Sequence, residues 1–221
     1  IMFNTVTENL SQIQEDIVPY KPNIIAITKY FDVDAIIAAY EAGLRNFGES
    51  RVLEAIDKIN RLPEEIKKNS TFHFIGHLQG NKAKKAVKYF DYIHSVDSFK
   101  LASTISQEAK EENKVQKIFL QLNVAEEVQK FGYSKSDLVE EFPKIQELSN
   151  IKIVGLMSMA PLGAEENELR QLFTDVAKTK SELEKIYNCK LDELSMGMSQ
   201  DYKIAAQCGA TMLRIGRKLF R

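Results

Sequence analysis

Eight short, mostly apolar runs recur along this chain, and stretches with helical periodicity separate them. Continuous apolar runs of this length are typical of parallel strands that helices cover. The runs are Ile24–Thr28, Asn46–Gly48, Phe72–Gly76, Tyr92–Ser95, Lys117–Asn123, Ile153–Met157, Glu193–Met196 and Met212–Ile215. Alternating strands and helices indicate an α/β fold, and eight strands without an interruption predict a single (β/α)8 TIM barrel over residues 1–221.

Start and stop signals frame the helices between these runs. Asp32 stands before a helical pattern that Gly43 ends, which makes Asp32 the predicted N-cap. Ser136 is the predicted cap of a later helix, and residues 3–19 predict an extra helix before the first strand. The alternative architecture is a doubly wound open sheet. Such a sheet normally carries a glycine-rich fingerprint after an early strand, and AITKYFD at 26–32 lacks one.

Composition excludes several classes of protein. The chain has 221 residues with 30 basic and 31 acidic side chains, so it has no basic footprint for nucleic acid. No apolar run is long enough to span a bilayer and no signal peptide is apparent, which predicts a cytoplasmic protein without membrane association. The two cysteines and the histidines His73 and His94 lack metal-ligand spacing, so we expect reduced thiols, structural histidines and no metal.

Polar residues gather where the predicted strands end. The segments are GES at 48–50, GHLQ at 76–79, HSVDS at 94–98, SMGMSQD at 195–201 and RIGR at 214–217. Barrel enzymes build their sites at this rim, so the segments predict one pocket. Lys29 follows the first run, where partial desolvation would lower the pKa of its amine and favour Schiff-base chemistry. The competing interpretation is an ordinary rim lysine that reaches water or pairs with a carboxylate.

The segments at 195–201 and 214–217 predict an anion-binding site, because barrels often bind phosphate with the loops after strands seven and eight. Ser199 offers a hydroxyl and is the predicted N-cap of a helix at 201–207. Gly216 allows close backbone approach, and Arg214 and Arg217 add positive charge. The competing interpretation is a capped turn beside surface arginines. A Schiff-base lysine and a phosphate cradle on one rim suit a phosphorylated aldehyde, and pyridoxal phosphate (PLP) is such an aldehyde.

Five longer segments carry a family resemblance. They are AITKYFDVDAIIAAYEAGLRNFGESRV (26–52), FHFIGHLQGNK (72–82), IHSVDS (93–98), GLMSMAP (155–161) and LSMGMSQDYKIAAQCGATMLRIGRKLF (194–220). In this order, over nearly the whole length, they make the chain resemble the pyridoxal phosphate homeostasis proteins. These are single-domain relatives of the alanine racemase N-terminal barrel, so the resemblance also implies the barrel fold.

The resemblance implies PLP as cofactor and a role for each matching residue. Lys29 matches the lysine that forms the internal aldimine, and Ser199 matches a phosphate-binding serine. Gly216 and the backbone of Arg217 match the second phosphate loop. Arg214 matches the arginine that faces the pyridine nitrogen. Ser50 stands where the family usually has asparagine, so its contact near the cofactor would be shorter or lost.

These features favour a carrier over an enzyme. An arginine opposite the pyridine nitrogen disfavours a proton there, which weakens the ring as an electron sink. The resemblance implies that racemases take their second base from another domain, and only five residues follow Gly216 here. We therefore predict no catalytic residue. We expect a monomer that takes up, buffers and delivers PLP inside the cell, with apo-forms of PLP-dependent enzymes as recipients.

Three other functions stay open at this point. They are a PLP-dependent amino-acid racemase, a Schiff-base lysine aldolase that needs no PLP, and an interaction module with a decayed site. A racemase would need a second base, for which the candidates are Tyr30, His77, Tyr133 and Tyr202. Turnover of amino acids would indicate the racemase, and turnover of sugar phosphates would indicate the aldolase. Failure to bind PLP would indicate the interaction module.

Overall fold

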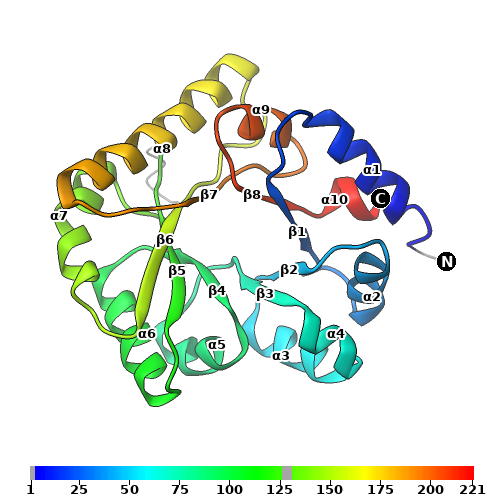
Figure 1. Ribbon diagram of the computed structural model, residues 1–221, viewed down its shortest axis with the longest axis horizontal. Coiled ribbons are helices and arrows are strands. Elements are labelled where there is room, and N and C mark those ends of the chain that lie inside the picture. The colour runs from blue at the N-terminus through cyan, green and yellow to red at the C-terminus, as the bar shows by residue number, and fades with distance from the viewer. Residues whose placement is uncertain (1–2, 126–130) are drawn as a thin grey trace.

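The chain folds into a closed barrel of eight parallel strands (Figure 1), seen in a computed structural model that describes residues 3–125 and 131–221. The strands are β1 (Asn23–Ile27), β2 (Asn46–Glu49), β3 (Thr71–Phe74), β4 (Tyr92–Val96), β5 (Gln116–Gln121), β6 (Ile151–Met157), β7 (Glu193–Ser195) and β8 (Met212–Ile215). Each predicted run overlaps one strand, and the bounds differ by at most two residues. Pairing of β1 with β8 closes the ring, which confirms the TIM barrel and excludes an open sheet.

Helices cover the outside of the ring (Figure 1). They are α1 (Val6–Asp16), α2 (Val33–Glu41), α3 (Val52–Arg61), α4 (Glu64–Asn69), the short 3-10 helix η1 (Gly80–Lys82), α5 (Ala83–Tyr89), α6 (Phe99–Glu111), α7 (Lys135–Gln146), α8 (Glu166–Tyr187), α9 (Tyr202–Gln207) and α10 (Arg217–Phe220). Within the described ranges, none of them is both long and apolar enough to cross a membrane.

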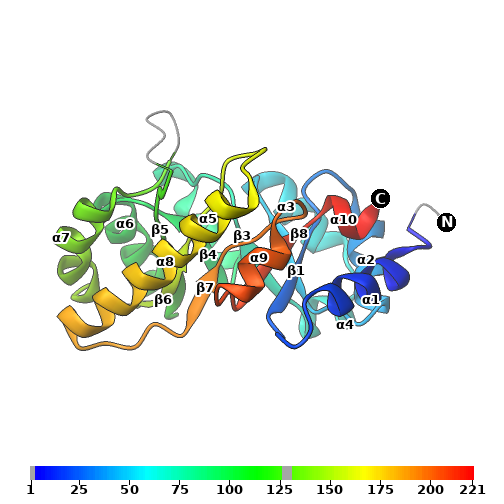
Figure 2. The same cartoon turned by 90° about the horizontal axis from the view of Figure 1, so that it is seen from above.

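The extra N-terminal helix is present as α1, and it lies beside the last helix, α10 (Figure 2). Asn9 Nδ2 donates a hydrogen bond to the Leu219 carbonyl over 2.8 Å. The rings of Phe3 and Phe220 meet edge to face with centroids 5.6 Å apart. The helix α1 thus packs against the four-residue α10 and buries Val6, Leu10 and Ile13.

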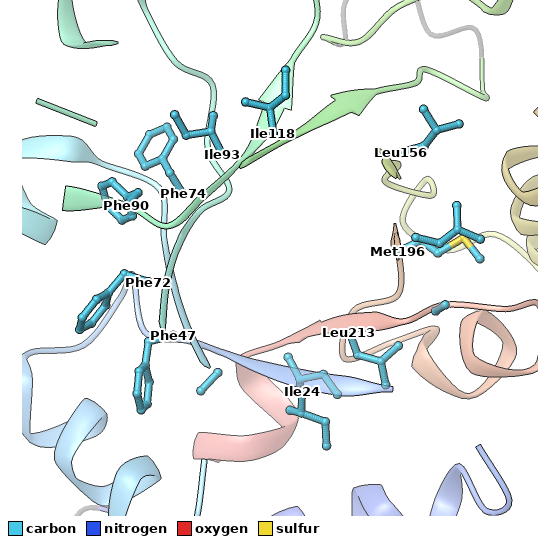
Figure 3. Close-up of a cluster of buried hydrophobic side chains, with 14 of the residues drawn as sticks. Ile24, Phe47, Phe72, Phe74, Phe90, Ile93, Ile118, Leu156, Met196 and Leu213 are labelled. Carbon is cyan, nitrogen blue, oxygen red and sulfur yellow. The ribbon is translucent and has the colours of Figure 1, made fainter. Parts of the chain in front are cut away.

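Apolar side chains form two layers, because successive residues of a strand point to opposite faces. The larger layer lies between strands and helices, and Figure 3 shows Phe47, Phe74 and Ile93 among its members around the ring. A smaller cluster, which includes Ile25 and Phe119, fills the barrel interior. The interior also holds polar side chains, and these position the site described below.

The structure confirms one predicted helix cap and corrects another. Asp32 Oδ1 accepts a hydrogen bond from the Val33 N–H over 2.9 Å, and Gly43 ends this helix region with a φ of 106°. For α7 the cap is Ser134, whose hydroxyl accepts from the Asp137 N–H over 3.2 Å. The predicted cap, Ser136, lies inside the first turn instead. Both serines precede the same apolar pattern, so the spacing alone could not distinguish them.

Candidate functional site

A cavity of about 710 Å³ opens at the carboxyl ends of the strands. Three of the six predicted site residues line this cavity: Lys29 after β1, Ser50 after β2 and Arg214 of β8. Met198 and Gln200 from the loop after β7 also line it, and they flank Ser199. A cavity of this size accommodates a small cofactor.

Lys29 follows β1 directly and is half-buried, whereas Thr28 before it is fully buried. Its Nζ lies 5.1 Å from the centroid of the Tyr30 ring. The Lys29 side chain borders the central cavity and also a neighbouring cavity of about 530 Å³. A rigid strand end therefore presents this amine at the wall between two cavities.

A buried cluster that sequence reasoning missed fixes the end of β1. Lys58 of α3 donates to both carboxylate oxygens of Glu49 over 3.1 Å and to the Thr28 carbonyl over 3.0 Å. The Thr28 hydroxyl donates to Glu49 over 2.5 Å. Burial raises the pKa of the Glu49 carboxyl, while the Thr28 hydroxyl and the Lys58 ammonium oppose that rise. The only sequence signal was an acidic residue at the end of a buried strand.

Arg214 is the largest polar side chain in the barrel interior and is 1% exposed. Its Nη1 donates to the Ser195 hydroxyl over 2.6 Å, and its Nη2 donates to the Ser158 carbonyl over 2.8 Å. Its Nε is buried and has no hydrogen-bond partner in the part of the chain that the structure describes. Burial lowers the pKa of the guanidinium to about 10, and Asp201 opposes that effect. The site therefore holds a buried cation with one unused donor.

The two loops predicted to bind phosphate contact each other. The Ser199 hydroxyl accepts a hydrogen bond from the Lys218 N–H over 3.1 Å, which joins the loop after β7 to the start of α10. Ser199 is not the cap of the helix at 201–207, as the sequence predicted. Asp201 precedes α9, and its carboxylate accepts from the Met198 N–H over 2.7 Å, so Asp201 closes the turn and leaves Ser199 to face α10.

Gly216 and Arg217 lie at that same junction, outside the lining of the central cavity. A side-chain carbon on Gly216 would lie 3.3 Å from the Ile27 carbonyl oxygen, which is closer than nine in ten real contacts of this kind. The backbone here therefore packs tightly against the end of β1. Arg217 is exposed, so its side chain projects away from the interior.

Ser50 packs against the loop after β3. A side-chain carbon on Gly76 would lie 2.4 Å from the Ser50 carbonyl oxygen, so only glycine allows the two loops to approach this closely. Beyond Gly76, the His77 ring stacks on Phe131 with centroids 3.7 Å apart, and both rings line the cavity. The sequence indicated His77 at the rim but gave no sign of its distant stacking partner.

Two of the four candidate second bases, Tyr133 and Tyr202, donate hydrogen bonds to carboxylates. Tyr133 donates to Glu141 over 2.9 Å, and burial raises the pKa of its phenol further above the usual value. Tyr202 donates to Asp16, and burial again raises the phenol pKa. A phenol with a raised pKa that already gives its proton to a carboxylate is a poor base near neutral pH. Tyr30 is 76% exposed.

Both predicted structural histidines, His73 and His94, are fully buried inside the barrel. His73 stacks on Tyr92 with centroids 4.7 Å apart, and His94 stacks on Phe119 at 4.2 Å. Burial lowers the pKa of His73 to about 3, and it lowers that of His94 well below its usual value. Within the described ranges, no group of three or more histidine, cysteine or acidic residues is arranged to hold a metal.

The buried His73 makes the fold acid-sensitive. The unfolded chain binds a proton at this ring below about pH 6.5, whereas the folded chain does so only near pH 3. The unfolded state therefore binds more protons in that window, and stability falls as the pH falls. We expect His73→Gln to reduce the slope of the unfolding free energy against pH by up to about 1.4 kcal/mol per pH unit. Urea unfolding at several pH values measures this, with the exposed His77→Gln as control. Equal slopes for His73→Gln and wild type would contradict the expectation.

The family model of the alanine racemase N-terminal domain matches residues 1–221. The pyridoxal phosphate homeostasis protein of Synechocystis sp. is 39% identical over 91% of this chain and 92% of its own length. The chain belongs to the pyridoxal phosphate homeostasis protein family. The resemblance inferred from the five sequence segments is thereby confirmed.

Solved structures agree with this membership. PipY of Synechococcus elongatus, solved without PLP, is 40% identical and superposes with a TM-score of 0.91 over 98% of this chain and all of its own. PipY has also been solved with PLP bound, and that form gives a TM-score of 0.88 at 39% identity. An alanine racemase of Clostridium difficile shares the fold at 16% identity, and the match covers 56% of the racemase chain. Homeostasis proteins thus share the racemase barrel at a shorter total length.

Proposed function

We propose that this chain is one PLP-binding barrel domain over residues 1–221 that takes up, buffers and delivers the cofactor inside the cell without turning over a substrate. The observation that carries the proposal is the placement of Lys29 and Arg214 on one cavity, beside the junction of the loops after β7 and β8. Relatives named for PLP homeostasis and the PLP-bound form of PipY support the same choice of cofactor.

The residues present fit PLP in chemistry. PLP offers an aldehyde, a phosphate and a pyridine nitrogen. Lys29 would supply the primary amine that holds the aldehyde as a Schiff base, with the release of one water. The Arg214 Nε–H is a buried donor that has no partner among the described residues, and it suits a neutral ring nitrogen as acceptor.

The phosphate belongs, in this proposal, at the junction of the two loops. The Ser199 hydroxyl and the backbone at Gly216 and Arg217 supply donors, and the tight packing of Gly216 on Ile27 supports a backbone cradle. Ser50 borders the cavity with a shorter side chain than the family's usual asparagine, so we assign it a supporting contact.

The proposed function needs no second base. Tyr133 and Tyr202 hold structural hydrogen bonds to carboxylates, so their engagement disfavours a racemase that would rely on either. We propose that the chain acts as a cytoplasmic monomer and that apo-forms of PLP-dependent enzymes receive the cofactor. An open cavity mouth lined by Lys29 suits transfer to an incoming amine.

Absorption spectroscopy tests the proposal. Added PLP should give a visible band, and borohydride reduction followed by peptide mapping should place the label on Lys29. Amino acids incubated with the PLP-loaded protein should keep their configuration. A label spread over surface lysines would overturn the cofactor site, whereas racemisation would overturn the carrier role and keep the site.

A further inference from the structure

A continuous chain of hydrogen bonds crosses the barrel interior and ends on Arg214. Arg214 Nη1 donates to the Ser195 hydroxyl. This hydroxyl lies 2.8 Å from His94 Nδ1, and His94 Nε2 lies 2.9 Å from His73 Nδ1. His73 Nε2 lies 2.8 Å from Asn46 Oδ1. The members come from five different strands, so only the closed barrel brings them together.

With neutral histidines, the two ends of this series of hydrogen bonds fix its direction. A guanidinium has no acceptor, so Arg214 must donate to Ser195. Ser195 then gives its single proton to His94 Nδ1. A neutral His94 carries its proton on Nε2 and donates it to His73 Nδ1. His73 in turn donates from Nε2 to the amide oxygen of Asn46. With both histidines neutral, every link has one donor and one acceptor, and the Asn46 oxygen at the far end fixes which nitrogen of each ring carries the proton.

The surroundings of the two rings favour the neutral form. Both rings are fully buried between aromatic side chains. The charged groups that act on them are cations, Lys117 of β5 on His73 and Arg214 of β8 on His94. A proton on either ring would add a second buried cation and would turn one acceptor in the chain into a donor. The chain is therefore polarised in one direction, away from the cavity.

We propose that Ser195, His94 and His73 are positioning residues that hold the Arg214 guanidinium in the orientation that leaves its Nε–H free for an acceptor in the cavity, the ring nitrogen of PLP. Ser195 and the Ser158 carbonyl occupy the two terminal nitrogens of the guanidinium, so rotation would break two hydrogen bonds. No member of the chain is a carboxylate, so none neutralises the Arg214 charge. This inference rests on the proposed cofactor and extends it to residues remote from the cavity lining.

Nitrogen NMR of the histidine rings in the ligand-free protein tests the direction of the chain without any cofactor. We expect both buried rings to carry their proton on Nε2 and to keep it there from about pH 8 to about pH 5. The exposed His77 provides a reference signal in the same spectra. A proton on Nδ1 of either buried ring, or protonation of either ring in this range, would overturn the inference.

Binding measurements test the positioning role. Ser195→Ala removes the acceptor for Arg214 Nη1, and we expect PLP affinity to fall on the order of tenfold, because hydrogen bonds to charged groups contribute this much. Ser95→Ala is the matched control. Ser95 is a buried serine next to His94, and the Ser95 hydroxyl has no hydrogen-bond partner among the described residues. Ser195→Thr keeps a hydroxyl and should bind PLP as wild type does.

A PLP analogue with carbon in place of the ring nitrogen separates positioning from general support of the fold. Its affinity should be the same for wild type and Ser195→Ala, because the analogue offers no acceptor to Arg214. An equal loss for PLP and the analogue would mean a merely structural serine and would overturn the proposal. Wild-type protein that binds neither molecule would instead refute the proposed function, while the NMR result still decides the direction of the chain. The NMR measurement uses the wild-type protein, so it tests the proposal even if Ser195→Ala does not fold.

Discussion

Lys29→Ala should abolish covalent capture of PLP. The visible band and the borohydride-fixed label should both disappear, because Lys29 is the one lysine among the described residues that line the central cavity, and Lys58 is held by Glu49 and the Thr28 carbonyl. The remaining contacts, Arg214 and the two loops, would still hold the cofactor non-covalently. We expect the apparent Kd to rise on the order of a hundredfold, which corresponds to about 2.7 kcal/mol. Spectral titration and equilibrium dialysis measure the two effects separately.

Two control variants sharpen this experiment. Lys29→Arg keeps a positive charge but offers no amine that forms a stable imine, so it should also lose the band. Lys152→Ala removes an exposed lysine near the start of β6, at the opposite end of the barrel, and should behave as wild type. Retention of a borohydride-fixed label in Lys29→Ala would show that the covalent site lies elsewhere.

Glu49→Ala should destabilise the fold by about 3–5 kcal/mol, because it leaves the Lys58 ammonium buried without its partner. Glu49 is 2% exposed and Lys58 is 7% exposed, so water cannot replace the lost carboxylate. The same change frees the Thr28 hydroxyl directly before Lys29. PLP capture should therefore weaken as well. Urea unfolding measures the stability, and spectral titration of the still-folded protein measures the capture.

The surface ion pair of Arg170 with Glu166 provides the matched control. The side chains are 44% and 71% exposed, and their nitrogen and oxygen lie 3.3 Å apart. Glu166→Ala should change the unfolding free energy by less than about 1 kcal/mol, since solvent screens exposed pairs. If Glu49→Ala costs no more than Glu166→Ala, the buried cluster does not support the end of β1 as described.

Much of the fold could be predicted because local pattern and global topology agree. Each buried strand appears as an apolar run, and the runs at Asn46 and Glu193, which hold few apolar residues, form strands that pair with a neighbour on either side. The caps show the limit of such reasoning. Ser136 and Ser199 are good capping residue types, yet Ser134 caps α7 and Asp201 precedes α9. The choice between adjacent polar residues depends on which side chain faces the N–H groups.

The sequence by itself determined the barrel, the rim where polar residues gather, and Lys29, Ser50 and Arg214 as candidates for one cavity. Only the tertiary structure revealed the Glu49–Lys58 pair under Lys29 and the chain from Arg214 through Ser195 and the two histidines to Asn46. The physical reason is that strand periodicity tells which face a side chain occupies but not what it meets there. His94 and Ser195 are 101 residues apart in sequence and bond only because the closed ring turns both toward its axis.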